Sequence, residues 1–382
     1  MEIIEKKPKA VFGALAVHGR FRNSRILRLT TKGDKLNMVS IKDVAKEAGV
    51  SATTVSAVVN GLDCVKPSTR ERVLEAIDRL GYIPNVSARE LVTRKKQNIG
   101  LITMTYDRYE SRRHSKDGSE DIFYTEYILK IAECLENMGY GLLLENFYYE
   151  SGSKRLPKLI VQKRVDGVIV VGSLYTKEFI KLLRKYIPAV VALGCPSEFS
   201  DYVRNDYTES VTLPIRYLIA NGHRRIAYAS GDSLTSAYHY KLLGYQMALE
   251  EAGIPYREDY VFESKYLATE GYCVARKIME LPEETRPTAV MFASDIIAAG
   301  AYQYFYENRI RIPDEISVVG YENLPISCLL CPPLTSVDWH KDRMSEEACN
   351  IMLKRLEKSG GEQLGIVIPC NIVERSSVRK IE

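Results

Sequence analysis

From Ile99 onward the chain alternates short apolar runs with amphipathic stretches of helical length, and this alternation constrains the fold more than any other feature. The apolar runs are Ile99–Met104, Gly141–Glu145, Gly167–Val171, Ala189–Leu193, Arg225–Ala229, Ala289–Phe292 and Ile316–Gly320. Helical stretches lie between them, for example at 123–138, 208–221, 240–252, 268–280 and 295–308. Strands that alternate with helices predict parallel sheets with helices on both faces. About 280 residues are too many for one open sheet, so we expect two subdomains with a ligand cleft between them.

Residues 40–80 have a different pattern, which predicts three short helices. Their apolar stripes are Val44, Ala45 and Ala48, then Val55, Val58 and Val59, then Val73, Ile77 and Leu80. The residues expected to start or stop these helices are Ser40 with Asp43, Gly49, Ser51, Asn60-Gly61, Ser68 with Glu71, and Gly81. A helix, a glycine turn and a second helix make up the helix-turn-helix plan, in which the second helix enters the DNA major groove.

The second helix carries small residues on its predicted outward face, namely Ala52, Thr53, Ser56 and Ala57. Thr53 and Ser56 are able to hydrogen-bond to bases or phosphates, and Ala52 fits against a thymine methyl group. A three-helix bundle is also often a protein-binding module, and the pattern alone leaves that alternative open.

The charge distribution favours a polyanionic partner for the N-terminal part. Residues 1–98 contain nineteen Lys and Arg against ten Asp and Glu, a balance of +9, whereas the whole chain carries +4. The remaining residues therefore carry −5, and a basic N-terminal piece on an acidic body is typical of nucleic-acid binding. Residues 1–37 show no clean periodicity; we expect a disordered basic extension or a misassigned start codon, with an extra DNA-binding arm as the alternative.

Several classes of protein are disfavoured. The apolar run at 10–17 is too short to span a membrane and no cleavage site follows it, so we expect a cytoplasmic protein. The eight cysteines are irregularly spaced, and Cys328 and Cys331 lack the context of a redox or zinc motif. There is no phosphate-binding glycine loop, nucleophile elbow or His/carboxylate cluster, so we predict no enzyme activity, no cofactor and no metal.

Specific motifs carry a resemblance to a known family. They are Ile41–Ser51, Thr54-Val-Ser56, Val59-Asn-Gly61, Thr69–Val73, Leu80–Asn85, Asp166–Ile169, Asn221–Ile226, Gly244-Tyr245, Ser294-Asp295, Ile312–Tyr321 and Pro333–Thr335. Together they resemble the lactose-repressor/galactose-repressor family over residues 38 to about 375. The resemblance implies an all-α helix-turn-helix bundle followed by an α/β, periplasmic-binding-protein-like core of two Rossmann-like subdomains. The expected domains are the extension 1–37, the helix-turn-helix domain 38–84, the hinge and linker 85–98, and the effector-binding and dimerisation core 99–382.

The resemblance also implies how DNA is bound: by a homodimer that reads a pseudo-palindrome in double-stranded operator DNA. A hinge helix at 85–92 is expected to fold on DNA and push Leu91 into the minor groove, bending the duplex. The predicted DNA-binding residues are Ser51, Ala52, Thr53, Thr54, Ser56, Ala57, Asn60, Asn85, Ala88, Arg89 and Leu91. Many family members have arginine where this chain has Ala57, so the operator sequence or the mode of reading should differ.

The effector site is expected between the two lobes of the core. Motif matching places effector contacts at Tyr106, Asp107, Lys241, Tyr266, Ser294, Asp295 and Glu322. Lys241 replaces a usual arginine and Glu322 a usual aspartate, which implies a pocket of different shape. For Asp295 the alternative is a capping role at the start of its helix.

The resemblance implies a repressor of carbohydrate-utilisation genes that is located at the bacterial nucleoid and is controlled allosterically by a small molecule. The polar groups at these effector positions make a sugar the expected effector. Whether the effector induces or co-represses stays open. The alternatives are a regulator controlled by a phosphoprotein co-repressor and a cytoplasmic sugar-binding receptor. The receptor would leave residues 40–92 without a role.

Overall fold

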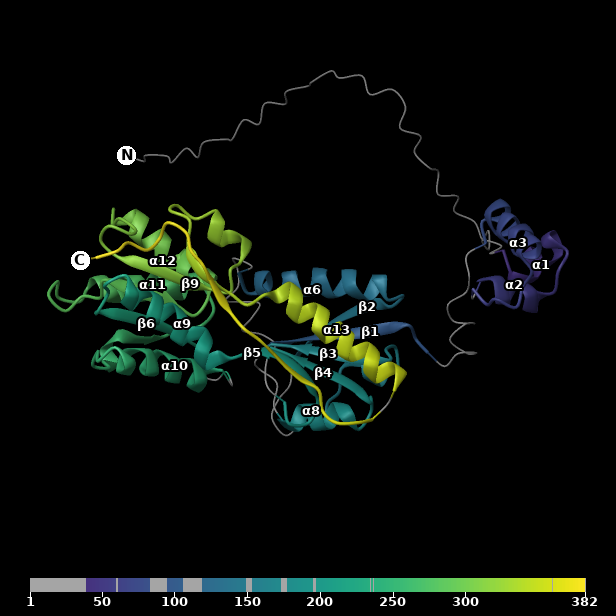
Figure 1. Cartoon of the computed structure of the whole chain (residues 1–382), viewed down its shortest axis with the longest axis horizontal. Helices are drawn as coiled ribbons and strands as arrows, with labels where there is room; N and C mark the ends of the chain where they lie inside the picture. Colours follow the sequence, from purple (N-terminus) through teal and green to yellow (C-terminus); the bar gives the residue numbers. More distant parts are fainter. Residues whose placement is uncertain are drawn as a thin grey trace, which may run out of the picture. The chain divides into compact units, whose positions relative to one another are not determined.

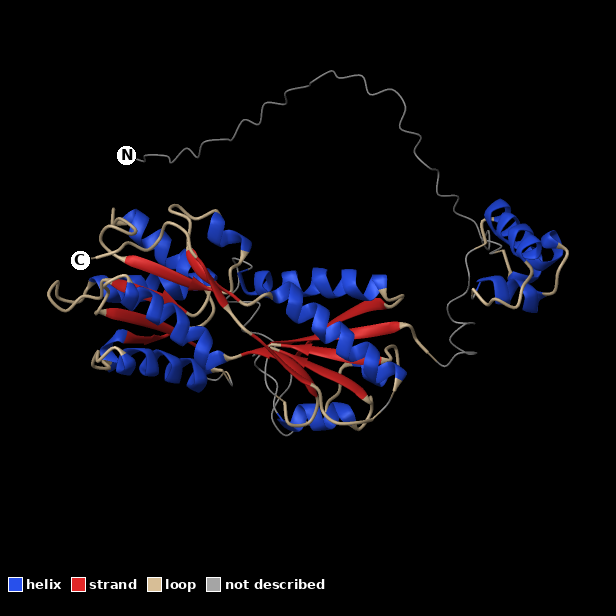
Figure 2. Cartoon of the chain, in the orientation of Figure 1, coloured by secondary structure: helices blue, strands red, loops and turns tan. Residues whose placement is uncertain are grey.

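The computed structural model describes residues 39–59, 61–82, 95–105, 119–148, 153–172, 177–194, 197–233, 235, 237–358 and 360–381. The chain divides into two compact units, residues 1–92 and 93–382. Figures 1 and 2 show the helices and strands of both units. The two units are described separately below.

The N-terminal unit contains α1 (Ile41–Ala48), α2 (Ala52–Val59) and α3 (Pro67–Leu80) around a small apolar core. The capping box predicted for α1 is confirmed, because Ser40 N donates to Asp43 Oδ2 at 2.8 Å and Asp43 N donates back to Ser40 Oγ at 3.4 Å. Gly49 follows α1 at φ 64°, a left-handed conformation that glycine adopts without strain. The helix-turn-helix arrangement is therefore present.

The predicted start of α3 is wrong by two residues. The sequence suggested a capping box of Ser68 and Glu71, whereas α3 begins at Pro67 with Lys66 before it and no side-chain cap. Proline suits the first helical position because its φ is already helical and its missing N–H would have no partner there. The N–H groups of Thr69 and Arg70 bond instead to the Lys66 carbonyl oxygen.

The first lobe of the core contains a parallel six-stranded sheet in the order β11-β5-β4-β3-β1-β2. Its strands are β1 (Asn98–Thr105), β2 (Gly141–Tyr148), β3 (Gly167–Val171), β4 (Ala189–Leu193), β5 (Asp201–Asn205) and β11 (Gly365–Ile368). Its helices are α6 (Ser119–Asn137), α7 (Lys158–Val161), α8 (Lys177–Arg184) and α13 (Lys341–Glu357). Helices α6 and α13 pack together on one face of the sheet, and α8 lies on the other (Figure 1).

The second lobe contains another six-stranded sheet, in the order β12-β10-β9-β8-β6-β7, with only the edge strand β12 antiparallel to its neighbour. Its strands are β6 (Ile226–Gly231), β7 (Val261–Glu263), β8 (Ala289–Phe292), β9 (Ser317–Tyr321), β10 (Thr335–Asp338) and β12 (Asn371–Val373). Its helices are α9 (Tyr207–Ala220), α10 (Tyr238–Glu251), α11 (Ala268–Met279) and α12 (Asp295–Glu307), with short 3-10 turns at Glu258–Tyr260 and Pro325–Cys328. The predicted α/β core of two Rossmann-like subdomains is confirmed.

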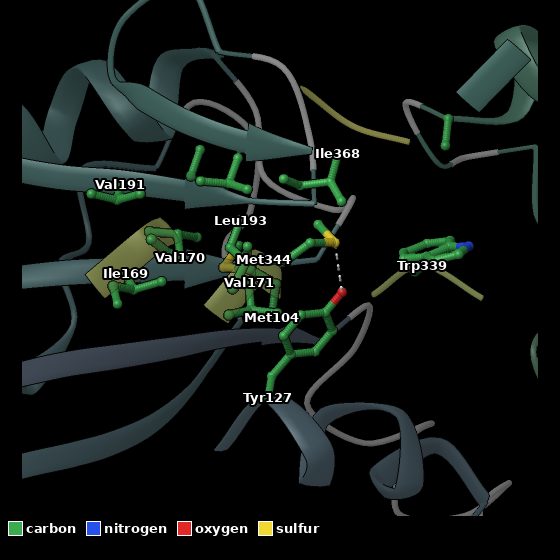
Figure 3. Close-up of a cluster of buried hydrophobic side chains, with 14 of the residues drawn as sticks. Met104, Tyr127, Ile169, Val170, Val171, Val191, Leu193, Trp339, Met344 and Ile368 are labelled. Carbon is green, nitrogen blue, oxygen red and sulfur yellow. Dashed lines mark hydrogen bonds between the residues drawn. The ribbon is translucent and has the colours of Figure 1, made fainter. Parts of the chain in front are cut away.

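Three chain segments cross between the lobes, after β5, after β10 and after β11. Asn205, at the end of β5, ties the three crossings together, because its Nδ2 donates to the carbonyl oxygens of Trp339 (3.2 Å) and Ile368 (2.9 Å). Figure 3 shows the apolar side chains of the first lobe next to this region, where the Tyr127 hydroxyl points at the Met344 sulfur 3.6 Å away. The three crossings are thus held together by hydrogen bonds and lie next to buried apolar side chains of the first lobe.

Candidate functional site

The helix expected to read DNA, α2, begins at a side-chain cap. Thr54 N donates to Ser51 Oγ at 3.1 Å, and the hydroxyl oxygens of Ser51 and Thr54 lie 2.9 Å apart. Val55 and Val58 are buried against α1 and α3, which turns the opposite face of α2 outward. Thr53 is exposed on that face, and Ser56 and Ala57 are half-buried. Ala52 is also half-buried and packs against the apolar core, so Thr53 is the most accessible of the four predicted reading residues.

Seven of the predicted site residues lie outside the described residues. They are Asn60, Asn85, Ala88, Arg89 and Leu91 of the DNA-binding set, and Tyr106 and Asp107 of the effector set. Their roles stay predictions.

The other effector candidates come together at the carboxyl ends of strands in the second lobe. Ser294 follows β8, Glu322 follows β9, Tyr266 follows β7, and Lys241 lies in the first turn of α10 after β6. Ser294 Oγ donates to Glu322 Oε2 at 2.9 Å and also caps α12 by accepting from Ile296 N. Because parallel strands end at one edge of a sheet, residues distant in the sequence meet here.

Lys241 lies among four aromatic rings, of which sequence analysis predicted only Tyr266 at the site. Its side chain is 3% exposed. The Nζ atom lies near the ring centroids of Tyr321 (4.2 Å), Trp339 (5.6 Å), Tyr266 (5.8 Å) and Tyr207 (5.9 Å). An ammonium group beside aromatic faces gains cation–π attraction, which offsets part of the cost of its burial. Tyr207 and Trp339 lie on crossings between the lobes, so the site draws on both.

Glu322 occupies an unusual position for a carboxylate. It is 5% exposed, and its backbone is left-handed at φ 98°. Burial raises the pKa of Glu322 to about 8, while the nearby ammonium groups of Lys241 and Lys341 favour its ionised form and Asp295 opposes it. Burial therefore favours the protonated carboxyl group, which is able to donate as well as accept a hydrogen bond.

Asp295 has an internal role in this arrangement. Its carboxylate accepts from Tyr321 N, Leu324 N, Ser327 Oγ and Ser336 Oγ at 2.6–2.7 Å. Four donors occupy the acceptor sites of both oxygens, and the side chain is fully buried. This geometry leaves little room for the effector contact that the motif suggested. It also differs from the capping alternative, because Ser294 caps α12 and Asp295 bonds to residues outside that helix. Asp295 fixes the loop that carries Glu322 to the start of α12.

The described residues give little support for a metal site, a membrane-spanning helix or a catalytic histidine. In the residues that the structure describes, no three His, Cys, Asp or Glu side chains group into a metal site. Within the same residues, no helix is long and apolar enough to cross a membrane. His223 is buried with its ring nitrogens 2.9 Å from Thr288 Oγ1 and 3.2 Å from the Arg379 carbonyl oxygen, a structural arrangement.

Comparison with known proteins agrees with these features. Residues 40–85 match the family of bacterial regulatory proteins of the lacI type, and residues 215–378 match a periplasmic binding protein-like domain. The chain is 33% identical to the HTH-type transcriptional repressor PurR of Histophilus somni (strain 2336), over 90% of this chain and 100% of that protein.

Solved structures show the same fold. A complex of the transcriptional regulator CelR with cellobiose is 27% identical, covers 89% of this chain and 99% of its own, and has a TM-score of 0.64. A lac repressor dimer bound to operator and the anti-inducer ONPF is 24% identical with the same coverage and a TM-score of 0.73. The chain belongs to the lacI family of bacterial regulatory proteins and is a DNA-binding transcriptional repressor rather than an enzyme.

Proposed function

We propose that the chain acts as a homodimer on a pseudo-palindromic operator, and that a small molecule bound beside Lys241 and Glu322 controls its DNA affinity. The observation that carries this proposal is the meeting of a buried ammonium and a buried carboxyl group among four aromatic rings at the carboxyl ends of strands. A few convergent polar groups in an apolar surround, one with a perturbed pKa, are typical of a ligand site. If effector binding alters DNA affinity, DNA alters effector affinity by the same factor.

A sugar is the first candidate for the effector, and carbohydrate-utilisation genes are the corresponding targets. The hydroxyl groups of a sugar match the ammonium, carboxyl and hydroxyl groups of Lys241, Glu322 and Ser294, and an aromatic ring such as Tyr266 can stack on its apolar face. The likeness to the CelR–cellobiose complex supports this choice. A planar base such as a purine is the second candidate, because the same rings would stack on it.

Trp339 provides a direct test of ligand binding, since it is the single tryptophan of the chain and its ring lies 5.6 Å from Lys241 Nζ. We expect its fluorescence to change on titration of the full chain with cellobiose or another sugar. A saturable response to purine bases and none to sugars would replace the sugar by the second candidate. No response to either class would contradict a small-molecule site around Lys241.

A matched pair of variants shows whether the response comes from this site. Lys241→Met removes the buried ammonium and should abolish saturable binding, because the ligand's acceptor loses its donor. Lys265→Met makes the same change at an exposed position nearby and should leave binding intact. An equal loss of binding in both variants would mean that the ligand binds elsewhere or that binding depends only on the net charge of the chain.

The DNA arm of the proposal is tested by selecting genomic fragments with the full chain at two salt concentrations. We expect enrichment of one pseudo-palindrome that persists at the higher salt. Leu91→Ser should weaken repression in a reporter assay, whereas Leu62→Ser, at an exposed loop position, should not. Weak, sequence-blind binding that disappears with salt would favour the phosphoprotein co-repressor, and no binding would contradict a DNA-binding role.

The predicted dimer is tested by light scattering of the purified chain at about micromolar concentration. A mass of two chains is expected. A mass of one chain or four chains would contradict the dimer, and with it the expected spacing of two operator half-sites.

A further inference from the structure

Lys341 is a buried cation whose position the proposed effector site does not require. It is the first residue of α13, a helix that packs on α6 and β4 in the first lobe. It is 7% exposed. A lysine at the start of a helix meets the positive end of the helix dipole, which disfavours it, and burial disfavours the charge further. Some compensating interaction must therefore hold it there.

Two oxygens from different lobes supply that compensation. Lys341 Nζ lies 2.8 Å from Glu126 Oε2 on α6, within the first lobe. The same Nζ donates to the carbonyl oxygen of Glu322, which lies beyond β9 in the second lobe. The ion pair with Glu126 is therefore internal to one lobe, whereas the bond to Glu322 joins the two.

The acceptor of this bond lies in a tightly held turn. Glu322 N donates to the Val337 carbonyl oxygen at 2.9 Å, and Asn323 N donates to Ser336 Oγ at 3.0 Å. Glu322 and Asn323 are both left-handed, at φ 98° and 47°. A non-glycine pair in this conformation costs backbone energy that surrounding contacts must offset. The Glu322 carbonyl group is consequently aimed in one direction, toward Lys341, while its side chain faces Ser294.

We infer that Lys341 is a positioning residue that fastens the second lobe to the first at Glu322 and so fixes how the two lobes meet at the proposed effector site. The charged groups around this contact are Glu126 on α6, Glu322 beyond β9, Asp295 on α12 and Lys241 on α10. If the lobes part, Lys341 keeps Glu126 and loses Glu322. The link to effector control rests on the proposed function, but the fastening itself does not.

Amide hydrogen exchange of the full chain, without DNA or effector, tests the fastening. Lys341→Met keeps the length and apolar stem of the side chain but removes the donor. We expect exchange at Tyr321–Asn323, in the other lobe, to accelerate about tenfold or more, because a buried bond from a charged donor is lost. Lys354→Met makes the same change at an exposed position of the same helix and should leave this segment unchanged.

Two further variants separate positioning from general stability. Lys341→Arg retains a cationic donor and should restore slow exchange at Tyr321–Asn323. Glu126→Gln removes the charge partner of Lys341 but keeps the bond between the lobes. It should therefore accelerate exchange in α6 more than at Tyr321–Asn323. The same variant tests the inference if Lys341→Met fails to fold. Faster exchange confined to α6 and α13 in Lys341→Met, or no rescue by arginine, would overturn the inference. The exchange experiment uses no ligand, so its failure would refute the fastening alone. Failure of the proposed effector site would be seen separately, as a lack of Trp339 response to sugars and purines in the unmodified chain.

Discussion

The protonation of Glu322 leads to a prediction about stability. Its carboxyl group is almost fully buried and receives one hydrogen bond from described residues, from Ser294 at 2.9 Å. Lys241 Nζ lies over the Tyr321 ring. Lys341 Nζ donates to the Glu322 carbonyl oxygen and forms an ion pair with Glu126. Burial has a larger effect on the pKa of Glu322 than the attraction of these two ammonium groups.

The size and sign of the effect follow from the pKa. Burial raises the pKa of Glu322 from 4.5 to about 8. Each pKa unit corresponds to about 1.4 kcal/mol, so complete ionisation costs the folded state up to about 5 kcal/mol. A raised carboxyl pKa means that the folded state binds the proton more tightly than the unfolded state. The stabilisation is therefore complete below pH 4.5 and is lost as the pH rises through about 8.

Glu322→Gln removes this titration while retaining a neutral, hydrogen-bonding side chain. We expect the unfolding free energy of the variant, relative to the unmodified chain, to rise by a few kcal/mol between about pH 5 and about pH 9. Urea unfolding followed by Trp339 fluorescence measures it, since that tryptophan lies in the core unit. Glu250→Gln, exposed on α10, is the control. A difference that is constant with pH, or that changes only below pH 4.5, would refute the reasoning and indicate an ionised Glu322 held by the lysines.

Three more predictions concern other parts of the chain. Arg355→Ala should destabilise the core by about 3–5 kcal/mol in urea unfolding, because the buried carboxylate of Asp201 loses the two hydrogen bonds that Arg355 donates at 2.6 and 2.7 Å. A loss of stability below about 1 kcal/mol would contradict a buried ion pair. Gly320→Ala should lower the thermal midpoint, since an added Cβ would lie 2.0 Å from Asp295 Oδ1. An unchanged midpoint would mean that Asp295 and the end of β9 move apart without cost. Ala57→Arg should strengthen binding to operators with guanine opposite that position by about 1–3 kcal/mol, measured by fluorescence anisotropy on a set of operators; an equal gain on every sequence would mean that the arginine contacts phosphate only.

Buried parallel strands could be predicted from the sequence because both faces of each strand are covered and every residue is apolar. β3, β4 and β8 span the predicted residues. β5 escaped prediction because its inward side chains include Asp201 and Asn205, which local patterns assign to loops. Arg355 and the Trp339 carbonyl oxygen satisfy them from more than 130 residues away. No local periodicity can reveal partners at that separation. The short edge strands β11 and β12 lacked a pattern long enough to recognise.

Residues of the candidate site could be predicted where they follow a strand that the sequence pattern reveals, and not elsewhere. Lys241, Ser294 and Glu322 were found because motifs place them at the ends of recognisable strands. Tyr207 and Trp339 follow β5 and β10, strands that the pattern did not reveal, so neither residue could be placed at the site. Lys341 and Glu126 became visible only when the packing of α13 on α6 was known. From the first lobe the sequence predicted only Tyr106 and Asp107, which lie outside the described residues, and it missed Lys341 and Glu126.

Ser294 and Glu322 of the candidate site already bond to each other, which limits the ligands that the proposed effector site is able to accept. Glutamate at 322 is one methylene longer than the aspartate that is usual there, and its carboxyl group reaches Ser294 Oγ at 2.9 Å. A ligand entering between them must replace this bond with at least one donor and one acceptor, or leave a buried group unpaired at a cost of about 1–3 kcal/mol. Binding is then an exchange of hydrogen bonds. Sites of this kind discriminate strongly against an analogue that lacks one polar group, whereas an apolar pocket discriminates only weakly against an analogue that lacks one methyl group. Ligands with adjacent donors and acceptors, such as neighbouring sugar hydroxyls or the edge of a purine, meet the requirement, whereas apolar ligands of the same size do not.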